Sequence, residues 1–312
     1  MRRLWFSALK AVAPSLVFIA FANGAFAQKA PPEQAKRFDY VKSTAVPAMA
    51  GGVFRKAKCC DITEWKLPRP EDAGGGDVEL TVVAPISKGR HPVVLWLHRE
   101  GNEVKRAIFV QEAEALAASG IASLLVELPF SKPYVMRSGS NAGDAETISS
   151  AVIDTRRALD WAATRPEFNI EKVAVVGHRF GAWAATLLTA VDARVDALVL
   201  MSPPGKPSGW LQVTEQPRAK KFRESFDKDA WISYLAAIEP LDPEKWIQYA
   251  APAKVHFQFA SGDQWVQTLE QVDLYRAAAQ PKTRQMFDSD EILNDEARKD
   301  RAVWLKKALL GK

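Results

Sequence analysis

The chain has 312 residues, of which 47% are hydrophobic and 25% are charged, an ordinary composition for a globular protein. It excludes a disordered, a collagen-like or a disulfide-stapled protein, and the length is sufficient for one large α/β domain with a sizeable core. The formal net charge is +5, but residues 1–27 hold three of the 42 basic side chains and none of the 37 acidic ones. The rest of the chain is therefore close to neutral, and without a basic stripe it is not expected to bind nucleic acid.

The first 27 residues have the pattern of a secretory signal peptide. Arg2 and Arg3 form a charged start, residues 12–21 are mostly apolar, and residues 25–27 (Ala-Phe-Ala) form a small-x-small cleavage site. An N-terminal membrane anchor is the alternative, but the apolar stretch is short for a spanning helix of roughly 20 residues. We therefore expect cleavage after Ala27, an exported and most simply periplasmic protein, and no stable membrane span after cleavage.

Residues 28–76 are predicted to form an extended N-terminal segment, because residues 28–58 are rich in Ala, Lys and Pro and have no clear periodicity. The segment contains the two cysteines of the chain, Cys59 and Cys60. As neighbours they cannot crosslink distant parts of the chain, which leaves two free thiols facing opposite ways, a vicinal disulfide or a link between two chains. The pair lacks the spacing and partners of a zinc site, and we expect neither a metal nor a cofactor.

From residue 77 onward, strand patterns and helix patterns alternate along the chain. Strands are predicted where short runs are apolar or alternate between apolar and polar residues: 77–85, 93–97, 121–128, 172–176, 197–201, 255–260 and 283–287. Helices are predicted by apolar spacing and by their start and stop signals: 103–119, 144–165, 181–190, 266–279 and 295–310. A helical insertion rich in aromatic residues is predicted at 206–250.

This order of elements predicts an α/β fold. An antiparallel first strand followed by alternating strands and helices indicates a mostly parallel central sheet with helices on both faces. We expect this domain to span residues 77–312. Ligands of such sheets bind beyond the carboxyl ends of the strands.

One strand end carries an unusual turn. The strand at 172–176 runs into the next helix through Gly177-His178-Arg179-Phe180-Gly181. A sharp strand-to-helix turn needs small residues on both sides of its central residue, whose side chain then points into the site. A serine at the centre would make this turn a nucleophile elbow.

With this turn, the chain resembles the α/β-hydrolase family, in particular its esterase and dienelactone-hydrolase-like branch, over residues 77–310. Three other landmarks occur in the family's order. Residues 98–101 resemble the oxyanion loop, residues 262–263 resemble the acid turn, and residues 287–294 resemble the segment that carries the triad histidine before the last helix.

The chain departs from the family at the catalytic positions. The elbow holds Arg179, whose guanidinium stays protonated and is not a nucleophile. The histidine position holds Glu291, and no histidine follows His256. Asp263 remains where the orienting acid stands. The resemblance thus implies three triad-equivalent positions, Arg179, Asp263 and Glu291, that are predicted not to be catalytically competent.

The resemblance places further residues around the ligand: His98, Arg99, Glu100, Gly101, His178 and Phe180. Structural roles stay open for several residues. His98 could satisfy backbone groups at its strand end, and Asp263 could cap a helix. The aromatic residues of 206–250 could form either a core or a cradle for the substrate. In a working hydrolase the nucleophile and the base lie within hydrogen-bond reach. We therefore expect Arg179 and Glu291 to form an ion pair, with Asp263 as a second acceptor.

The leading hypothesis is an exported α/β-hydrolase homologue without serine-hydrolase activity that acts as a binding or regulatory pseudoenzyme. Arg179 and the helix N-terminus favour a small anionic ligand, although pairing with Glu291 would close the site, and an ester-like ligand is the alternative. A second hypothesis is a hydrolase of small carboxylic esters that uses water activated by Glu291 or Asp263, or a relocated serine, Ser202 or Ser261. A third is a structural module that binds a partner protein. The oligomeric state is left open.

Overall fold

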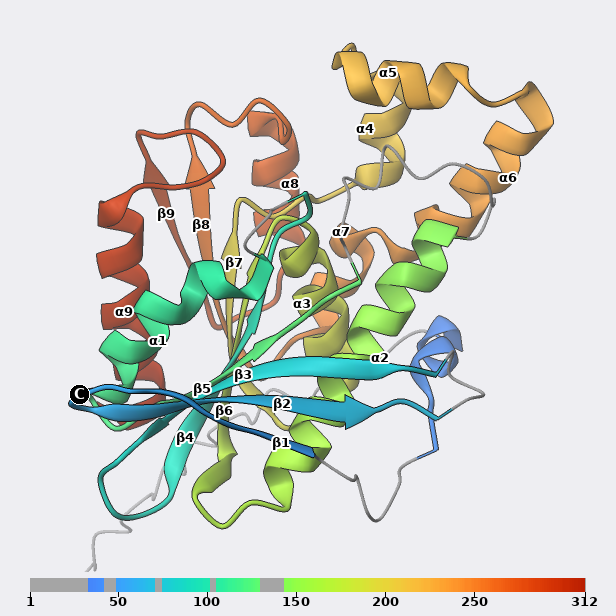
Figure 1. The fold of residues 1–312 in the computed structure, drawn as a ribbon. Helices are drawn as coiled ribbons and strands as arrows, with labels where there is room; N and C mark the ends of the chain where they lie inside the picture. Colours follow the sequence, from blue (N-terminus) through green and yellow to red (C-terminus); the bar gives the residue numbers. More distant parts are fainter. Residues whose placement is uncertain (1–32, 42–48, 71–74, 102–104, 130–142, 312) are drawn as a thin grey trace, which may run out of the picture.

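The computed structural model describes residues 33–41, 49–70, 75–101, 105–129 and 143–311, so the predicted signal peptide lies outside the described residues. Within these ranges, one sheet of nine strands runs in the order β1-β2-β3-β5-β4-β6-β7-β8-β9 (Figure 1). The strands are β1 (Met49–Lys56), β2 (Cys60–Pro68), β3 (Asp77–Pro85), β4 (His91–Leu97), β5 (Ala122–Val126), β6 (Phe168–His178), β7 (Val195–Met201), β8 (Lys254–Ala260) and β9 (Lys282–Phe287).

The sheet is mostly parallel. The strands β1, β2 and β3 pair antiparallel with one another, and β3 pairs antiparallel with β5. All pairs from β5 through β4 to β9 are parallel. This confirms the fold class predicted from the sequence, an α/β fold with an antiparallel start.

Helices cover both faces of this sheet (Figure 1). The helices α1 (Val110–Ala117), preceded by the 3₁₀ helix η3 (Lys105–Phe109), and α9 (Asp295–Leu310) pack on one face. The other face is covered by the helices α2 (Gly143–Ala163), α3 (Phe180–Val191) and α8 (Thr268–Ala277) and by the 3₁₀ helix η1 (Glu33–Phe38). The residues of β4 alternate between the two cores: Val93, Leu95 and Leu97 face α2 and α3, whereas Val94 and Trp96 face α1 and α9. A strand buried on both sides explains the unbroken apolar run in the sequence.

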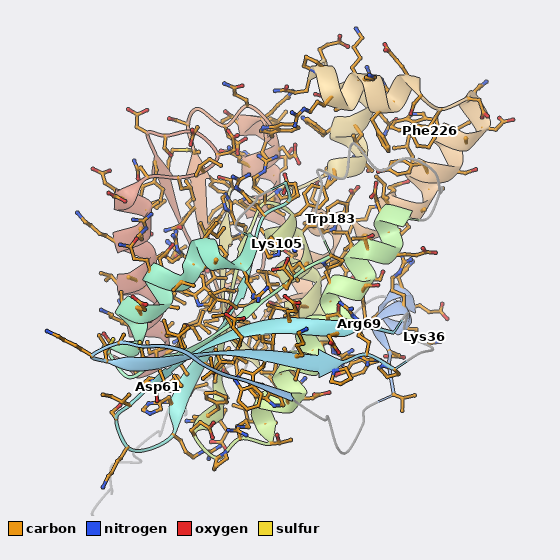
Figure 2. All side chains as sticks on the ribbon, viewed as in Figure 1. Lys36, Asp61, Arg69, Lys105, Trp183 and Phe226 are labelled. Atoms are coloured by element: carbon orange, nitrogen blue, oxygen red, sulfur yellow. The ribbon has the colours of Figure 1, made fainter. Side chains whose placement is uncertain are left out.

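A helical segment lies between β7 and β8. It comprises α4 (Pro207–Val213), α5 (Pro217–Glu224), α6 (Lys228–Ile238) and α7 (Pro243–Trp246), with single 3₁₀ turns η5 (Glu239–Leu241) and η6 (Ile247–Tyr249). Proline begins α4, α5 and α7, where its fixed φ suits the first turn and its missing N–H is not needed. Figures 1 and 2 show α5 and α6 extending away from the sheet, with Phe226 among their side chains.

Aromatic contacts hold this segment together and attach it to the sheet. Phe222, Phe226, Trp231 and Tyr234 form a cluster with ring centroids between 4.9 and 6.4 Å apart. The indole N–H of Trp183 on α3 donates to the carbonyl of Leu241 at 2.6 Å. Phe222 and Tyr234 belong to the same buried core as α2 and α3, and Phe226 and Trp231 pack against it.

The sequence analysis does not predict β1 and β2 within residues 28–76. The burial of β2 is irregular, with fully buried residues at Ile62 and Leu67 but partly exposed residues between them, so no clean alternation marks the strand. Cys60 begins β2 and is buried, Cys59 is half-buried, and both are free thiols whose sulfur atoms lie 3.4 Å apart. No helix of the described residues combines the length and hydrophobicity needed to cross a membrane.

Candidate functional site

The turn between β6 and α3 has the geometry of a sharp elbow. Arg179 at its centre has φ 52° and ψ −109°, a backbone conformation that residues with a side chain rarely adopt. A Cβ atom on Gly181 would lie 2.1 Å from the carbonyl oxygen of Leu97, and one on Gly177 would lie 2.4 Å from that of Gly181. Both glycines are therefore required for the close approach of α3 to the end of the sheet.

Arg179 forms a buried ion pair with Glu100. Its Nε donates to Glu100 Oε1 at 2.9 Å, and the two residues are only 8% and 7% exposed. The second carboxylate oxygen of Glu100 accepts from the backbone N–H of Phe180 at 3.3 Å. Glu100 thus bridges the side chain of Arg179 and the first N–H of α3, where the helix dipole favours a negative charge.

The rest of the guanidinium group is only partly used. Its central carbon lies 4.8 Å from the ring centroid of Trp265, and Nη1 is buried without a hydrogen-bond partner. Burial lowers the pKa of Arg179, but the carboxylates of Glu100, Asp263 and Glu291 together raise it above the ordinary value. Arg179 is therefore a cation with one donor group still unsatisfied.

The expected ion pair between Arg179 and Glu291 is wrong: the ion pair of Arg179 in the described residues is with Glu100. Glu100 follows β4, which lies next to β6 in the sheet, so its side chain reaches the elbow directly. The loop that carries Glu291 is instead fixed through its backbone, because the Glu291 carbonyl accepts from His178 Nε2 at 2.8 Å.

The side chain of Asp263 stabilises the turn in which it lies. Its Oδ1 accepts from the backbone N–H groups of Trp265 and Val266 at 2.8 and 2.9 Å. Its Oδ2 is buried and has no partner. Burial raises the pKa of Asp263, an effect that these two N–H groups and the charge of Arg179 oppose. The residue orders the loop that presents Trp265.

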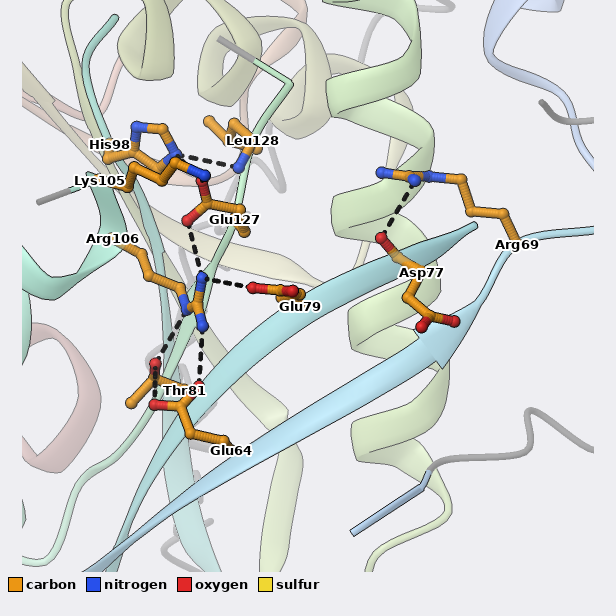
Figure 3. Close-up of polar contacts among 10 residues, drawn as sticks. All are labelled: Glu64, Arg69, Asp77, Glu79, Thr81, His98, Lys105, Arg106, Glu127 and Leu128. Carbon is orange, nitrogen blue, oxygen red and sulfur yellow. Dashed lines mark hydrogen bonds and ion pairs between the residues drawn. The ribbon is translucent and has the colours of Figure 1, made fainter. Parts of the chain in front are cut away.

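The two histidines near the site have structural contacts. His98 Nε2 accepts from the N–H of Leu128 at 3.0 Å, so the proton lies on Nδ1, which donates to the carbonyl of Arg99 at 2.8 Å (Figure 3). Burial lowers the pKa of His98, and it lowers that of His178 to about 3. Both rings are therefore neutral at ordinary pH, and each joins a strand end to a neighbouring loop.

The remaining predicted residues lie at the margin of the site or away from it. Arg99 is half-buried and Gly101 is exposed with φ 61°. Ser261 is exposed and donates to Asp288 at 3.3 Å. His256 is far from the elbow along the sheet, where it bonds Thr283 and Asp300 beside α9.

A pocket opens beside Arg179, beyond the carboxyl ends of β6 and β7. Its polar lining residues are Arg179, Ser202 and Glu270, and its apolar ones are Phe180, Pro204, Pro207, Trp210, Trp265 and Val266. Trp265 and Glu270 were not predicted at the site, and the sequence left open whether Trp210 and the other aromatic residues of 206–250 line it or form a core. The closeness of the two tryptophans in the sequence to the ends of strands could have indicated them: Trp265 lies two residues after Asp263 of the acid turn, and Trp210 lies nine residues after the end of β7.

Ser202 is the second polar group of this pocket with an unused atom. It directly follows β7, has φ 42°, and is 1% exposed. Its Oγ has no hydrogen-bond partner. In the described residues, no cluster of His, Cys, Asp and Glu side chains could hold a metal ion.

Comparison with solved structures identifies the fold. The chain is similar to an acetyl xylan esterase from Thermoanaerobacterium sp. JW/SL YS485, with a TM-score of 0.71 and 13% identity over 89% of this chain and 96% of that one. It is also similar to an acetyl xylan esterase from Paenibacillus sp. R4 (TM-score 0.70, 15% identity, 85% and 90% covered). An alpha/beta hydrolase from Penicillium sp. sh18 matches with a TM-score of 0.56 and 16% identity over 80% and 99% of the two chains.

The chain has the α/β-hydrolase fold. No protein-family model matches the sequence, and no curated protein matches it. The likeness therefore lies in the architecture. At the elbow of this α/β-hydrolase fold stands Arg179, and the loop after β4 contributes Glu100 to the same place.

Proposed function

We propose that this protein binds a small molecule at the elbow of its α/β-hydrolase fold and does not hydrolyse it. The observation that carries this proposal is the Arg179–Glu100 ion pair, whose carboxylate also accepts from Phe180 N–H. In active enzymes of this fold, the N–H after the nucleophile is one of the donors that stabilise the oxyanion. Glu100 brings a permanent negative charge to that donor, in the place where negative charge would have to develop during hydrolysis.

The residues that serine hydrolysis needs are also missing from their usual positions. The reaction needs a hydroxyl group, a base that takes its proton and a donor pair for the oxyanion. Arg179 supplies no nucleophile at the elbow, and Glu291 replaces the histidine of the last loop. The Oδ1 of Asp263 is engaged by two backbone N–H groups.

A second candidate function is ester hydrolysis by a relocated serine. Ser202 favours it, because its Oγ is unpartnered and lines the pocket beside Arg179. The lining residues include no histidine, and the pocket's one carboxylate, Glu270, is bonded to the N–H groups of Gly205 and Lys206 at 2.7 Å each. Nothing in the pocket is therefore arranged to take the Ser202 proton.

Labelling with a serine-directed fluorophosphonate, together with hydrolysis assays on short acyl esters, tests this proposal. We expect no covalent adduct on the purified mature protein and no ester hydrolysis above that of an Arg179→Ala variant or of buffer alone. Ser202→Ala is the matched control for the second candidate. A stoichiometric adduct on Ser202 that disappears in Ser202→Ala would establish a hydrolase instead.

We also propose that the protein works outside the cytoplasm after removal of its leader. Support comes from the charged start, the apolar stretch and the Ala-Phe-Ala site. Mass spectrometry of protein from its native cell envelope should find a mature N-terminus at Gln28. An Ala27→Arg variant should accumulate uncleaved. Intact Met1 on the membrane-bound wild-type protein would contradict export.

A further inference from the structure

We infer that the pocket beside Arg179 binds an uncharged aromatic molecule through a carbonyl or amide oxygen. This inference rests on the proposed function and adds the chemical class of the ligand. It follows from three properties of the lining residues: which hydrogen-bonding atoms are unused, how the walls are shaped, and how the charges balance.

The unused atoms favour a hydrogen-bond acceptor. Arg179 Nη1 and Ser202 Oγ are buried, have no partner, and belong to residues that are 8% and 1% exposed. Buried polar atoms are satisfied in the great majority of cases, so two unpartnered atoms on one pocket need an explanation. Arg179 can only donate, whereas the hydroxyl of Ser202 can donate or accept. An oxygen of the ligand is the group that both can bind.

The backbone at these two positions is held in an uncommon conformation. Arg179 and Ser202 have φ values of 52° and 42°, and they follow two neighbouring strands, β6 and β7. The N–H of Arg179 donates to the carbonyl of Met201 at 3.0 Å, which connects the two strand ends. Such conformations are unfavourable for residues with a side chain and cluster where ligands are held.

The walls of the pocket favour a flat apolar group. Trp210 and Trp265 approach each other with ring centroids 5.6 Å apart and an angle of 39° between their planes. Phe180 and Val266 are buried, and Pro204 and Pro207 complete the apolar lining. Rigid rings and prolines present fixed flat surfaces, which suit the stacking of an aromatic ring better than a flexible chain.

The charges favour a ligand without net charge. The positive charge of Arg179 is already balanced by Glu100, and the phenylalanine N–H at the start of α3 already binds that carboxylate. Glu270 adds a carboxylate to the lining, and Asp263 lies close enough to act on Arg179. A carboxylate ligand would add to this negative charge, and a cation would face the free N–H of the guanidinium. The anionic ligand suggested by the sequence is therefore disfavoured.

Three probes of one size separate these possibilities: benzamide, benzoate and benzylamine, which is an ammonium ion at neutral pH. Binding is followed on the full mature protein by the indole N–H resonances in NMR titrations. We expect benzamide to bind at least about 5-fold more tightly than either charged probe and to shift the resonances of Trp210 and Trp265. Tightest binding of benzoate or of benzylamine would overturn the inference, as would the absence of binding of all three.

Variants locate the site. Ser202→Ala removes an unpartnered hydroxyl, should keep the protein folded, and should weaken benzamide about 2- to 10-fold, the effect of losing one hydrogen bond. Trp265→Leu should weaken it further by removing a wall. Trp304→Leu is the matched control, because Trp304 stacks on His256 beside α9, outside the pocket. Equal affinity in the Ser202→Ala variant and the wild type would remove the assignment to this pocket.

The binding experiment and the hydrolysis assay can refute the two proposals independently of each other. Hydrolysis of acyl esters with tight benzamide binding would refute the proposed lack of turnover and keep the ligand class. Absence of turnover with no binding of benzamide would keep the first proposal and refute the ligand class.

Discussion

Two arginines, Arg106 in η3 and Arg179 at the turn between β6 and α3, differ in how many of their hydrogen-bond donors are used. Arg106 donates from all three nitrogens: Nε to Thr81 at 2.9 Å, Nη1 to Glu127 at 2.8 Å and Nη2 to Glu64 at 2.8 Å (Figure 3). Arg179 has one ion pair and an unpartnered Nη1. A guanidinium whose donors are all used can only hold the protein together, whereas one with a free donor at a pocket is available to a ligand.

The ion pairs of Arg106 and Arg179 also differ in how far they are exposed to solvent. Arg106 connects η3 to β2, β3 and the end of β5. Its carboxylate partners Glu64, Glu79 and Glu127 are 33%, 45% and 13% exposed. Arg179 and Glu100 have side chains only 10% and 9% exposed. Water can replace a lost partner in the first cluster but reaches the second poorly.

The largest difference is expected when each arginine is replaced by methionine. Arg179→Met leaves Glu100 as a buried carboxylate without a cation, and we expect the free energy of unfolding to fall by about 3–5 kcal/mol. Arg106→Met is the matched control, with an expected loss of about 1–2 kcal/mol, because Glu64 and Glu79 are partly exposed to water and Glu127 keeps its ion pair with Lys105. Urea denaturation measures both. A larger loss for Arg106→Met than for Arg179→Met would reverse the comparison.

A buried carboxylate that forms no ion pair within the described residues extends the comparison. Asp242 is fully buried and accepts from the N–H and hydroxyl of Ser208 at 3.1 and 2.5 Å. Burial raises the pKa of Asp242 from 3.8 to about 6, although both bonds from Ser208 oppose the shift. Because the folded state holds its proton more tightly than the unfolded state, this group stabilises the protein at low pH. That stability is lost as the pH rises from about 4 through about 6.

An Asp242→Asn variant isolates this effect, because its amide does not titrate. Between about pH 4 and about pH 8, the difference in unfolding free energy between variant and wild type should move in favour of the variant by about 3 kcal/mol. Asp229→Asn, an exposed carboxylate on α6, controls for the loss of one negative charge. Urea denaturation across this pH range measures the shift. A difference that does not change with pH would contradict the buried, unpaired state of Asp242.

The architecture was accessible from the sequence because it depends on local pattern. The alternation of residues 77–85 and the amphipathic spacing of residues 295–310 give β3 and α9 with the bounds observed. The two glycines of the elbow indicated the sharp turn for steric reasons. The strands β1 and β2 were missed. For β2 the reason is that its buried and exposed residues do not alternate regularly.

The ion-pair partner of Arg179 could not be predicted from the sequence in this way. Glu100 and Glu291 both stand near the elbow in the resemblance, and a choice between them depends on which side chain reaches the guanidinium in space. The structure favours Glu100, which follows the strand adjacent to the elbow strand. Likewise, only the packing of the segment after β7 against the loop after β8 brings Trp210 and Trp265 together.

The most direct test of the Arg179–Glu100 pairing is a double-mutant cycle with Arg179→Met, Glu100→Gln and the double variant, measured by urea denaturation. For a buried, hydrogen-bonded pair we expect a coupling energy of about 2–3 kcal/mol. The same cycle with Glu291→Gln should give a coupling energy below about 0.5 kcal/mol, because within the described residues the ion pair of Arg179 is with Glu100 and not with Glu291. Additive effects of Arg179→Met and Glu100→Gln, or a larger coupling to Glu291, would contradict the ion pair on which the proposed loss of hydrolysis rests.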